Sequence, residues 1–175
     1  MYRLEPVSTL ERCRVEAKEV TQDCMTLSEK PDAVLVNYNN RGYARVRFDE
    51  ASKACLLNNL RYVTDTAMRT YIWRTFKDMV QVNHLSIKDW FRLISNNLEF
   101  ETEEQTLEVV LDQVLKTFGH GLFTEEQITA IFNTVSKMEH QIRDEKGASK
   151  SALINSFCSS IVSTGIIIDP SEFTP

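Results

Sequence analysis

The sequence has no long apolar run and no excess of basic residues, and both absences limit what the protein can be. No stretch approaches the ~20 apolar residues that a membrane-spanning helix needs. Residues 1–16 contain no apolar core of the kind that a signal peptide has, so a cytoplasmic protein is expected. A formal net charge of −5 at pH 7 argues against nucleic-acid binding, which normally requires a basic face. Neither a membrane nor a nucleic acid is therefore an expected partner.

Cysteine and histidine are scarce, and neither has the spacing of a known type of site. None of the cysteines forms a C-x-x-C pair; they are Cys13, Cys24, Cys55 and Cys158. Free thiols in a reducing compartment are the simpler interpretation, and a disulfide between Cys13 and Cys24 across a hairpin is the alternative. No histidine lies four residues from another, so the H-E-x-x-H zinc motif is absent; the histidines are His84, His120 and His140. A nucleophile elbow and a phosphate-binding glycine loop are also absent. We therefore predict no metal site and no catalytic site in this chain.

The rest of the composition is that of an ordinary globular protein. Hydrophobic residues make up 42% and charged residues 26% of the chain, which is too apolar for a disordered protein. A length of 175 residues corresponds to about one domain, or to a small domain with a piece of a second.

The stretch of residues 33–50, AVLVNYNNRGYARVRFDE, predicts a β-hairpin followed by a helix. Residues 33–36 and 43–48 are rich in β-branched and aromatic residues, and the Asn-Asn-Arg-Gly between them favours a tight turn. Arg45 and Arg47 alternate with apolar residues, so a strand would place both arginines on one face. Asp49 is a typical N-cap residue for a helix that begins after it.

Two further short segments precede this hairpin. Residues 24–27 are typical of a short strand, whereas residues 10–20 alternate only in part and fit either a strand or a helix. Four short strands would leave exposed edges that need a covering surface. This predicts a partial β-sandwich and self-association through the β segment.

After Asp49 the pattern is helical, with regular capping signals. Thr102–Gln105 and Thr124–Gln127 match the S/T-x-x-E/Q capping box, Ser86–Asp89 matches it loosely, and Thr64 or Thr66 starts an earlier helix. Thr64 and Thr102, and likewise Ser86 and Thr124, are 38 positions apart (102 − 64 and 124 − 86). Paired helices at this period are typical of HEAT or armadillo repeats. Tyr71, Trp73, Trp90 and Phe91 are interpreted as helix–helix core rather than as a ligand cage.

The predicted fold class is therefore α+β, with a small antiparallel β-sheet followed by a stack of α-helical hairpins. We expect a partial β-sandwich over residues 1–49 and a helical repeat domain over residues 50–175. Three isoleucines, residues 166–168, follow the last predicted helix with nothing later to bury them. Because a solenoid normally ends in a polar capping helix, we expect the natural chain to continue.

Two stretches carry a resemblance to a known family. PDAVLVNYNNRGYARVRFDE and MRTYIWRTFKDMVQVNHLSIKDWFRLISNNLEFETEEQTLEVVL resemble the aminopeptidase N and puromycin-sensitive zinc aminopeptidases, above all the bacterial-type lysyl aminopeptidase N branch. The resemblance covers about residues 10–142 and implies the end of a small β-sandwich domain and the start of a C-terminal helical domain. It favours a strand for residues 10–20 and supports a truncated helical domain.

The catalytic elements of that family have no counterpart in this chain. Both H-E-x-x-H and the Gly-x-Met-Glu-Asn element that grips the substrate's α-amine are missing. No catalytic residue is carried over, and the resemblance implies that zinc belongs only to a catalytic domain outside this sequence.

Two charged clusters are candidates for an interaction surface. Arg45, Arg47 and Arg61 would form a basic patch near the junction of the two halves, although charge protection of a strand edge explains the first two more simply. Glu101, Glu103 and Glu104, with Glu99, could attract a basic peptide end, although a solvated helix N-terminus explains them more simply.

The resemblance suggests two functions. In the first, the chain is the non-catalytic C-terminal portion of a zinc aminopeptidase, where it braces the catalytic domain and encloses the cavity for peptide substrates. In the alternative, it is a stand-alone interaction module derived from such an enzyme, which binds a protein partner. In neither case is the chain alone expected to be an enzyme.

Overall fold

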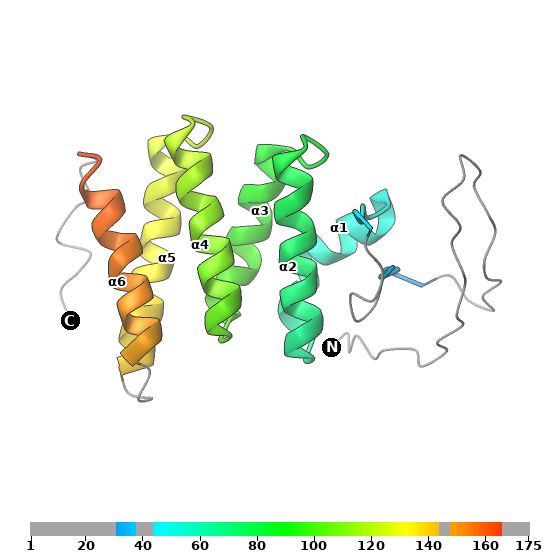
Figure 1. Ribbon diagram of the computed structural model, residues 1–175, viewed down its shortest axis with the longest axis horizontal. Helices are drawn as coiled ribbons and strands as arrows, with labels where there is room; N and C mark the ends of the chain where they lie inside the picture. The colour runs from blue at the N-terminus through cyan, green and yellow to red at the C-terminus, as the bar shows by residue number, and fades with distance from the viewer. Residues whose placement is uncertain (1–30, 38–43, 144–147, 166–175) are drawn as a thin grey trace.

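The computed structural model describes residues 31–37, 44–143 and 148–165. These residues form a series of α-helices with two short 3-10 turns (Figure 1). In chain order they are α1 (Glu50–Asn59), η2 (Leu60–Tyr62), α2 (Thr66–Gln81), α3 (Ile87–Asn97), η3 (Leu98–Phe100), α4 (Glu104–Gly119), α5 (Glu125–Arg143) and α6 (Ala148–Val162). None of these helices is both long enough and apolar enough to cross a membrane.

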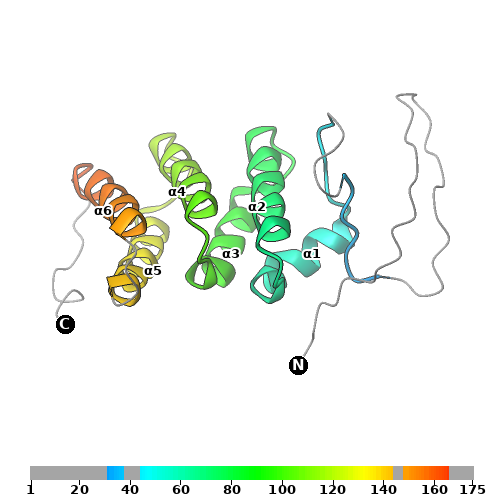
Figure 2. The same ribbon diagram turned by 60° about the horizontal axis from the view of Figure 1, so that its bottom comes forward.

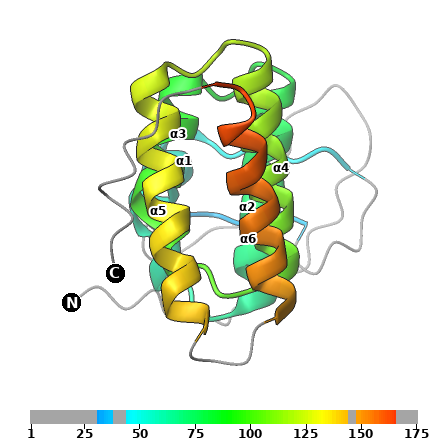
Figure 3. The same cartoon turned by 90° about the vertical axis from the view of Figure 1, so that its left-hand side faces the viewer.

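The helices are arranged in two layers. Helices α1, α3 and α5 form one layer and α2, α4 and α6 form the other, as the turned and end-on views show (Figures 2 and 3). Helices that follow one another within a layer are in contact, and α5 also lies against α6 across the layers. The core fills the space between the layers with fully buried side chains, which include Leu60, Phe76, Trp90, Val114, Ile128 and Ile161.

The α+β prediction is wrong for the part of the chain that the structure describes. Residues 33–36 and 43–48 were expected to pair as a hairpin, but neither residues 33–36 nor the described residues 44–48 form a strand. The two earlier predicted strands, the turn at residues 39–42 and the isoleucines at 166–168 lie outside the described residues. The described chain is all helical apart from its connections.

The side-chain alternation that suggested strands is nevertheless present in both segments. Val46 is half-buried and Phe48 buried, whereas Arg45 and Arg47 are exposed. Phe48 packs on Phe76 of α2, with ring centroids 5.0 Å apart. Period-two alternation reports which side chains face a core, and here that core is a helical surface rather than a second sheet.

Side chains of the helices bind the backbone of the first segment. The amide of Val34 donates to Oγ of Ser52 in α1 over 2.8 Å. The hydroxyl of Tyr71 in α2 donates to the carbonyl of Val36 over 2.6 Å. These contacts give the backbone hydrogen-bond partners in place of part of the strand pairing that the sequence suggested.

Three of the predicted helix starts are confirmed. The Asp49 carboxylate accepts hydrogen bonds from the amides of Ala51 and Ser52 at the start of α1. Oγ of Ser86 accepts from the amide of Asp89 at 3.0 Å. Thr124 forms the full reciprocal box with Gln127, in which each side chain accepts from the other residue's amide.

Helix α2 begins at Thr66, one of its two predicted starts, and its N-cap is Asp65, whose carboxylate accepts from the amide of Met68. The start of α4 differs from the prediction. Helix α4 has Glu103 as its N-cap and no side-chain cap, so the capping box predicted at Thr102 is wrong. The caps Asp65 and Glu103 still lie 38 positions apart (103 − 65), which preserves the predicted period.

Candidate interaction surface

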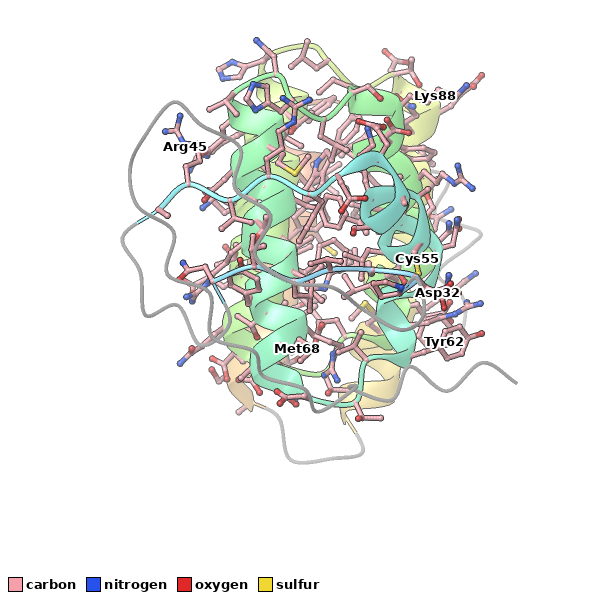
Figure 4. All side chains as sticks on the ribbon, turned by 90° about the vertical axis from the view of Figure 1, so that its right-hand side faces the viewer. Asp32, Arg45, Cys55, Tyr62, Met68 and Lys88 are labelled. Carbon is pink, nitrogen blue, oxygen red and sulfur yellow. The ribbon has the colours of Figure 1, made fainter. Side chains whose placement is uncertain are left out.

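The six residues predicted to form an interaction surface lie in three separate places. Arg45 and Arg47 are exposed in the extended segment before α1, and Arg61 is exposed in η2. Figure 4 shows Arg45 and Tyr62, the neighbour of Arg61, on opposite sides of this end of the molecule. The three glutamates lie at the link between η3 and α4. The structure therefore does not bring the arginines together as one patch.

Glu101 is buried and is the centre of a hydrogen-bond network. Arg69 binds it with two parallel contacts, from Nε to Oε2 at 3.3 Å and from Nη2 to Oε1 at 3.2 Å. The indole Nε1 of Trp73 donates to Oε2 at 3.1 Å. The amides of Thr102 and Glu103 donate to Oε1 at 3.0 and 3.1 Å. Bidentate pairing of this kind is the strongest geometry that an arginine and a carboxylate form.

The Arg69–Glu101 pair connects three segments of the chain. The side chains of Arg69 and Glu101 are only 12% and 1% exposed. Nη1 of Arg69 also donates to the carbonyls of Val63 and Thr64, just before α2, at 2.9 and 3.3 Å. The pair thus fixes the entry to α2 and the entry to α4 relative to each other. Its donors and acceptors are directed into the protein, so it is a structural element of the fold.

The two remaining glutamates lie at the start of α4. Glu103 and Glu104 are half-buried. The carboxylate of Glu104 accepts a hydrogen bond from Oγ of Ser149, which connects the first turn of α4 to the first turn of α6. Acidic groups at this position also interact favourably with the helix dipole. Any acidic surface at this end of α4 rests on Glu103 and Glu104, since the oxygens of Glu101 are occupied.

Arg61 belongs to an exposed cluster with two aromatic rings. Its guanidinium carbon lies 4.9 Å from the ring centroid of Tyr62 and 5.0 Å from that of Phe100. Tyr62 and Phe100 are 46% and 51% exposed. The three side chains come from η2 and η3, which are the turns that end α1 and α3. We call Arg61, Tyr62 and Phe100 the arginine–aromatic cluster.

A buried asparagine fixes the two turns that carry this cluster. Oδ1 of Asn97, which is 2% exposed, accepts the amide of Arg61 at 3.0 Å. Nδ2 of Asn97 donates to the carbonyls of Leu57 in α1 and Leu93 in α3 at 3.0 and 2.9 Å. Each turn is also held by a leucine with no exposed surface, Leu60 in η2 and Leu98 in η3. The base of the cluster is therefore rigid.

Three side chains near the start of the described chain have perturbed pKa values. Hydrogen bonds from the Ser52 hydroxyl and amide lower the pKa of Asp49. Burial raises the pKa of the Cys55 thiol, and the charge of Asp32, which lies near it in Figure 4, adds to this. Burial also raises the pKa of Tyr71. Cys55 and Cys158 are half-buried, whereas Cys13 and Cys24 lie outside the described residues.

The histidines and acidic residues form no metal site within the described residues. His84 and His120 are exposed in the turns after α2 and α4. No three histidine, cysteine, aspartate or glutamate side chains of the described chain lie close enough together to hold a metal ion. Trp73 and Trp90 are buried, and their rings meet edge to face at 6.0 Å, which confirms their interpretation as core.

Several residues of this surface have no direct signal in the sequence. Arg69 and Asn97 each lie on a helix with no motif around them, and their roles depend on partners 32 and 36 positions away. Tyr62 and Phe100 lie next to Arg61 and Glu101, which were selected by charge alone. The two aromatic residues do share one feature. Each is the third residue of a 3-10 turn that directly follows a helix.

Comparison with known proteins gives one match. The family model described as the ERAP1-like C-terminal domain matches residues 33–163. No curated protein and no solved structure shows a significant match to the chain. The matched range begins in the first extended segment and runs to the residue after α6.

Proposed function

Because the chain belongs to the family of ERAP1-like C-terminal domains, we propose that it is the non-catalytic helical part of an aminopeptidase N-like zinc metallopeptidase. In this role it braces a catalytic domain and helps to enclose the cavity that receives peptide substrates. The parent activity is removal of N-terminal amino acids from peptides in the cytoplasm. Zinc belongs to the catalytic domain and not to this chain.

The extent of the family match carries this proposal. Residues 33–163 include every described helix and nearly all of both extended segments. The match therefore concerns the whole described unit rather than a short shared motif. A C-terminal helical domain of the aminopeptidase type is what this range represents.

The internal contacts are consistent with a bracing role. A domain that braces another must be rigid. The buried Arg69–Glu101 pair and the buried Asn97 each connect segments that are distant in sequence. Buried, fully satisfied polar networks favour one arrangement over others, because any other arrangement leaves their groups unpaired.

Capture of the natural protein tests the proposal. The chain is tagged at its chromosomal locus, purified under mild conditions, and assayed with fluorogenic aminoacyl amides with and without a zinc chelator. We expect chelator-sensitive hydrolysis to accompany the tag, and intact mass shows whether the catalytic domain is on the same polypeptide or on a second subunit. The purified 175-residue chain alone serves as the control and should not hydrolyse the reporters.

Two results would contradict the proposal. Captured protein without aminopeptidase activity above an untagged control, and with the mass of the given chain, would favour the stand-alone interaction module. Chelator-sensitive turnover by the isolated chain would show instead that it carries a catalytic site of its own.

A further inference from the structure

We propose that the arginine–aromatic cluster of Arg61, Tyr62 and Phe100 is a docking site for a protein segment that carries an acidic side chain between apolar residues. The inference goes beyond the bracing role, because the binding that it predicts is a property of this chain alone. It rests on the geometry of the cluster, its exposure, the absence of an internal anion, and the rigidity of its base.

The first observation is that both rings contact the same cation. The guanidinium lies 4.9 Å from the Tyr62 centroid and 5.0 Å from the Phe100 centroid. The two rings do not pack on each other, since neither occurs in any ring pair of the described residues. Each ring therefore contacts the guanidinium rather than the other ring, and the N–H donors at the guanidinium edge are the groups that a ligand would bind.

The second observation is that this cation has no anionic partner in the described chain. The described ion pairs involve Lys53, Arg69 and Lys116, and no carboxylate among the described residues pairs with Arg61. Its only described hydrogen bond is donated by its backbone amide to Asn97. The side-chain donors remain open in a protein whose formal net charge is −5. An unpaired arginine on an acidic protein is a local site for an anion.

The third observation is that the cluster is exposed but held in place. The side chains of Tyr62 and Phe100 are 46% and 51% exposed. Asn97, which is 2% exposed, connects the ends of α1 and α3 by its hydrogen bonds. A site fixed in advance loses little conformational freedom when it binds. Tyrosine and arginine are also the residue types that dominate the energetics of protein–protein interfaces.

The chemistry of the cluster selects the partner. The planar guanidinium edge fits a carboxylate with two parallel hydrogen bonds. The two exposed rings that contact it offer two separate apolar surfaces, so the best ligand has apolar groups on both sides of its carboxylate. An internal aspartate or glutamate between apolar residues provides this, whereas a chain terminus provides it on one side only. A polyanion such as nucleic acid is disfavoured by the net charge of the protein.

A peptide titration followed by NMR tests the proposal on the full chain. The probe is a short peptide, acetylated and amidated, with one glutamate between two leucines, and the control probe has glutamine in place of glutamate. We expect saturable shifts of the amides in η2 and η3 and of the Arg61 Nε–H signal. The glutamine peptide lacks the charge, so its affinity should be lower by at least about tenfold.

Variants separate the cluster from general electrostatics. Arg61→Ala and Tyr62→Ala should lower the affinity for the glutamate peptide by about tenfold, and Arg61→Lys should have an intermediate effect. Arg45→Ala is the matched control, because Arg45 is also exposed but lies outside the cluster, and this variant should bind as the wild type does. Circular dichroism of each variant checks that the fold is intact.

Several results would overturn the proposal. Equal binding of the glutamate and glutamine peptides by the wild-type chain would exclude carboxylate recognition without reliance on any variant. Unchanged binding by Arg61→Ala, or an absence of shifts, would exclude the cluster. If acetate alone shifts the same signals as strongly as the peptide, the cluster binds small anions only. If Arg61→Ala abolishes a dimer seen by sedimentation, the occupant is a second copy of the chain.

Discussion

Replacement of Glu101 by glutamine should destabilise the protein more than any surface substitution. The substitution keeps the size of the side chain and removes its charge. Five donors converge on the Glu101 carboxylate, two from Arg69 and one each from Trp73, Thr102 and Glu103. A glutamine amide group would place its own N–H donors against some of them. Arg69, which is only 12% exposed, would lose its counter-charge.

The expected cost follows from the burial of the pair. Removal of one partner from a buried ion pair typically costs about 3–5 kcal/mol, because the other charge is left uncompensated. A domain of ordinary stability has a free energy of unfolding of about 5–15 kcal/mol, so the loss is a large share of the total. The thermal midpoint should fall by on the order of 10 °C.

Urea denaturation monitored by circular dichroism measures this difference, and Glu99→Gln is the control. Glu99 lies two positions earlier in η3 and is exposed, so its substitution should change the unfolding free energy by less than about 0.5 kcal/mol. A second variant, Arg69→Met, should also be destabilising. The double variant should cost less than the sum of the two single variants, because the second substitution removes the stranded charge. If Glu101→Gln were as stable as Glu99→Gln, the network would contribute little and the reasoning would be refuted.

Two further predictions concern helix caps. Thr124→Ala should lower stability by about 1 kcal/mol because the Thr124 hydroxyl accepts the amide of Gln127, whereas Thr102→Ala should be close to neutral because the described cap of α4 does not use that hydroxyl; equal losses in urea denaturation would contradict this assignment. Asp49→Asn should show a pH-dependent difference from the wild type. The folded-state pKa of Asp49 is lowered from 3.8, so its contribution is present above that value and is lost as the pH falls through the folded pKa. The stability difference between wild type and Asp49→Asn should therefore be constant between about pH 5 and 8 and shrink below about pH 4, and a difference that grows at acid pH would contradict it.

The helical half could be predicted because its signals are local. A cap such as Thr124 with Gln127 satisfies backbone amides within one turn, so the sequence contains both partners. The period of 38 positions between helix starts is also a property of the sequence alone and is retained by Asp65 and Glu103. Errors appear where a distant partner decides. At the start of α4, the carboxylate of Glu101 accepts from the Thr102 and Glu103 amides. The position of this carboxylate depends on its ion pair with Arg69.

The first helix shows the same limit in another form. The apolar Ala51 and Ala54 are both exposed in α1, whereas the polar Ser52 is buried. Oγ of Ser52 donates a hydrogen bond to the Asp49 carboxylate and accepts one from the amide of Val34. A pattern that counts only apolar residues cannot identify a buried serine whose hydroxyl both donates and accepts a hydrogen bond.

The hairpin error and the arginine–aromatic cluster have a common physical origin. A single-sequence pattern identifies the direction of a side chain but not the surface that it meets. For Phe48 the predicted direction was right, and the surface that it meets is helical. For Arg61 the charge suggested a basic patch with Arg45 and Arg47, whereas the fold places it against Tyr62 and Phe100. An arginine in a basic patch attracts anions without specificity. An arginine held against two rings can distinguish anions by the apolar groups next to them in the ligand. The specificity of this surface therefore depends on the two turns that Asn97 joins, and on the helix ends that those turns complete.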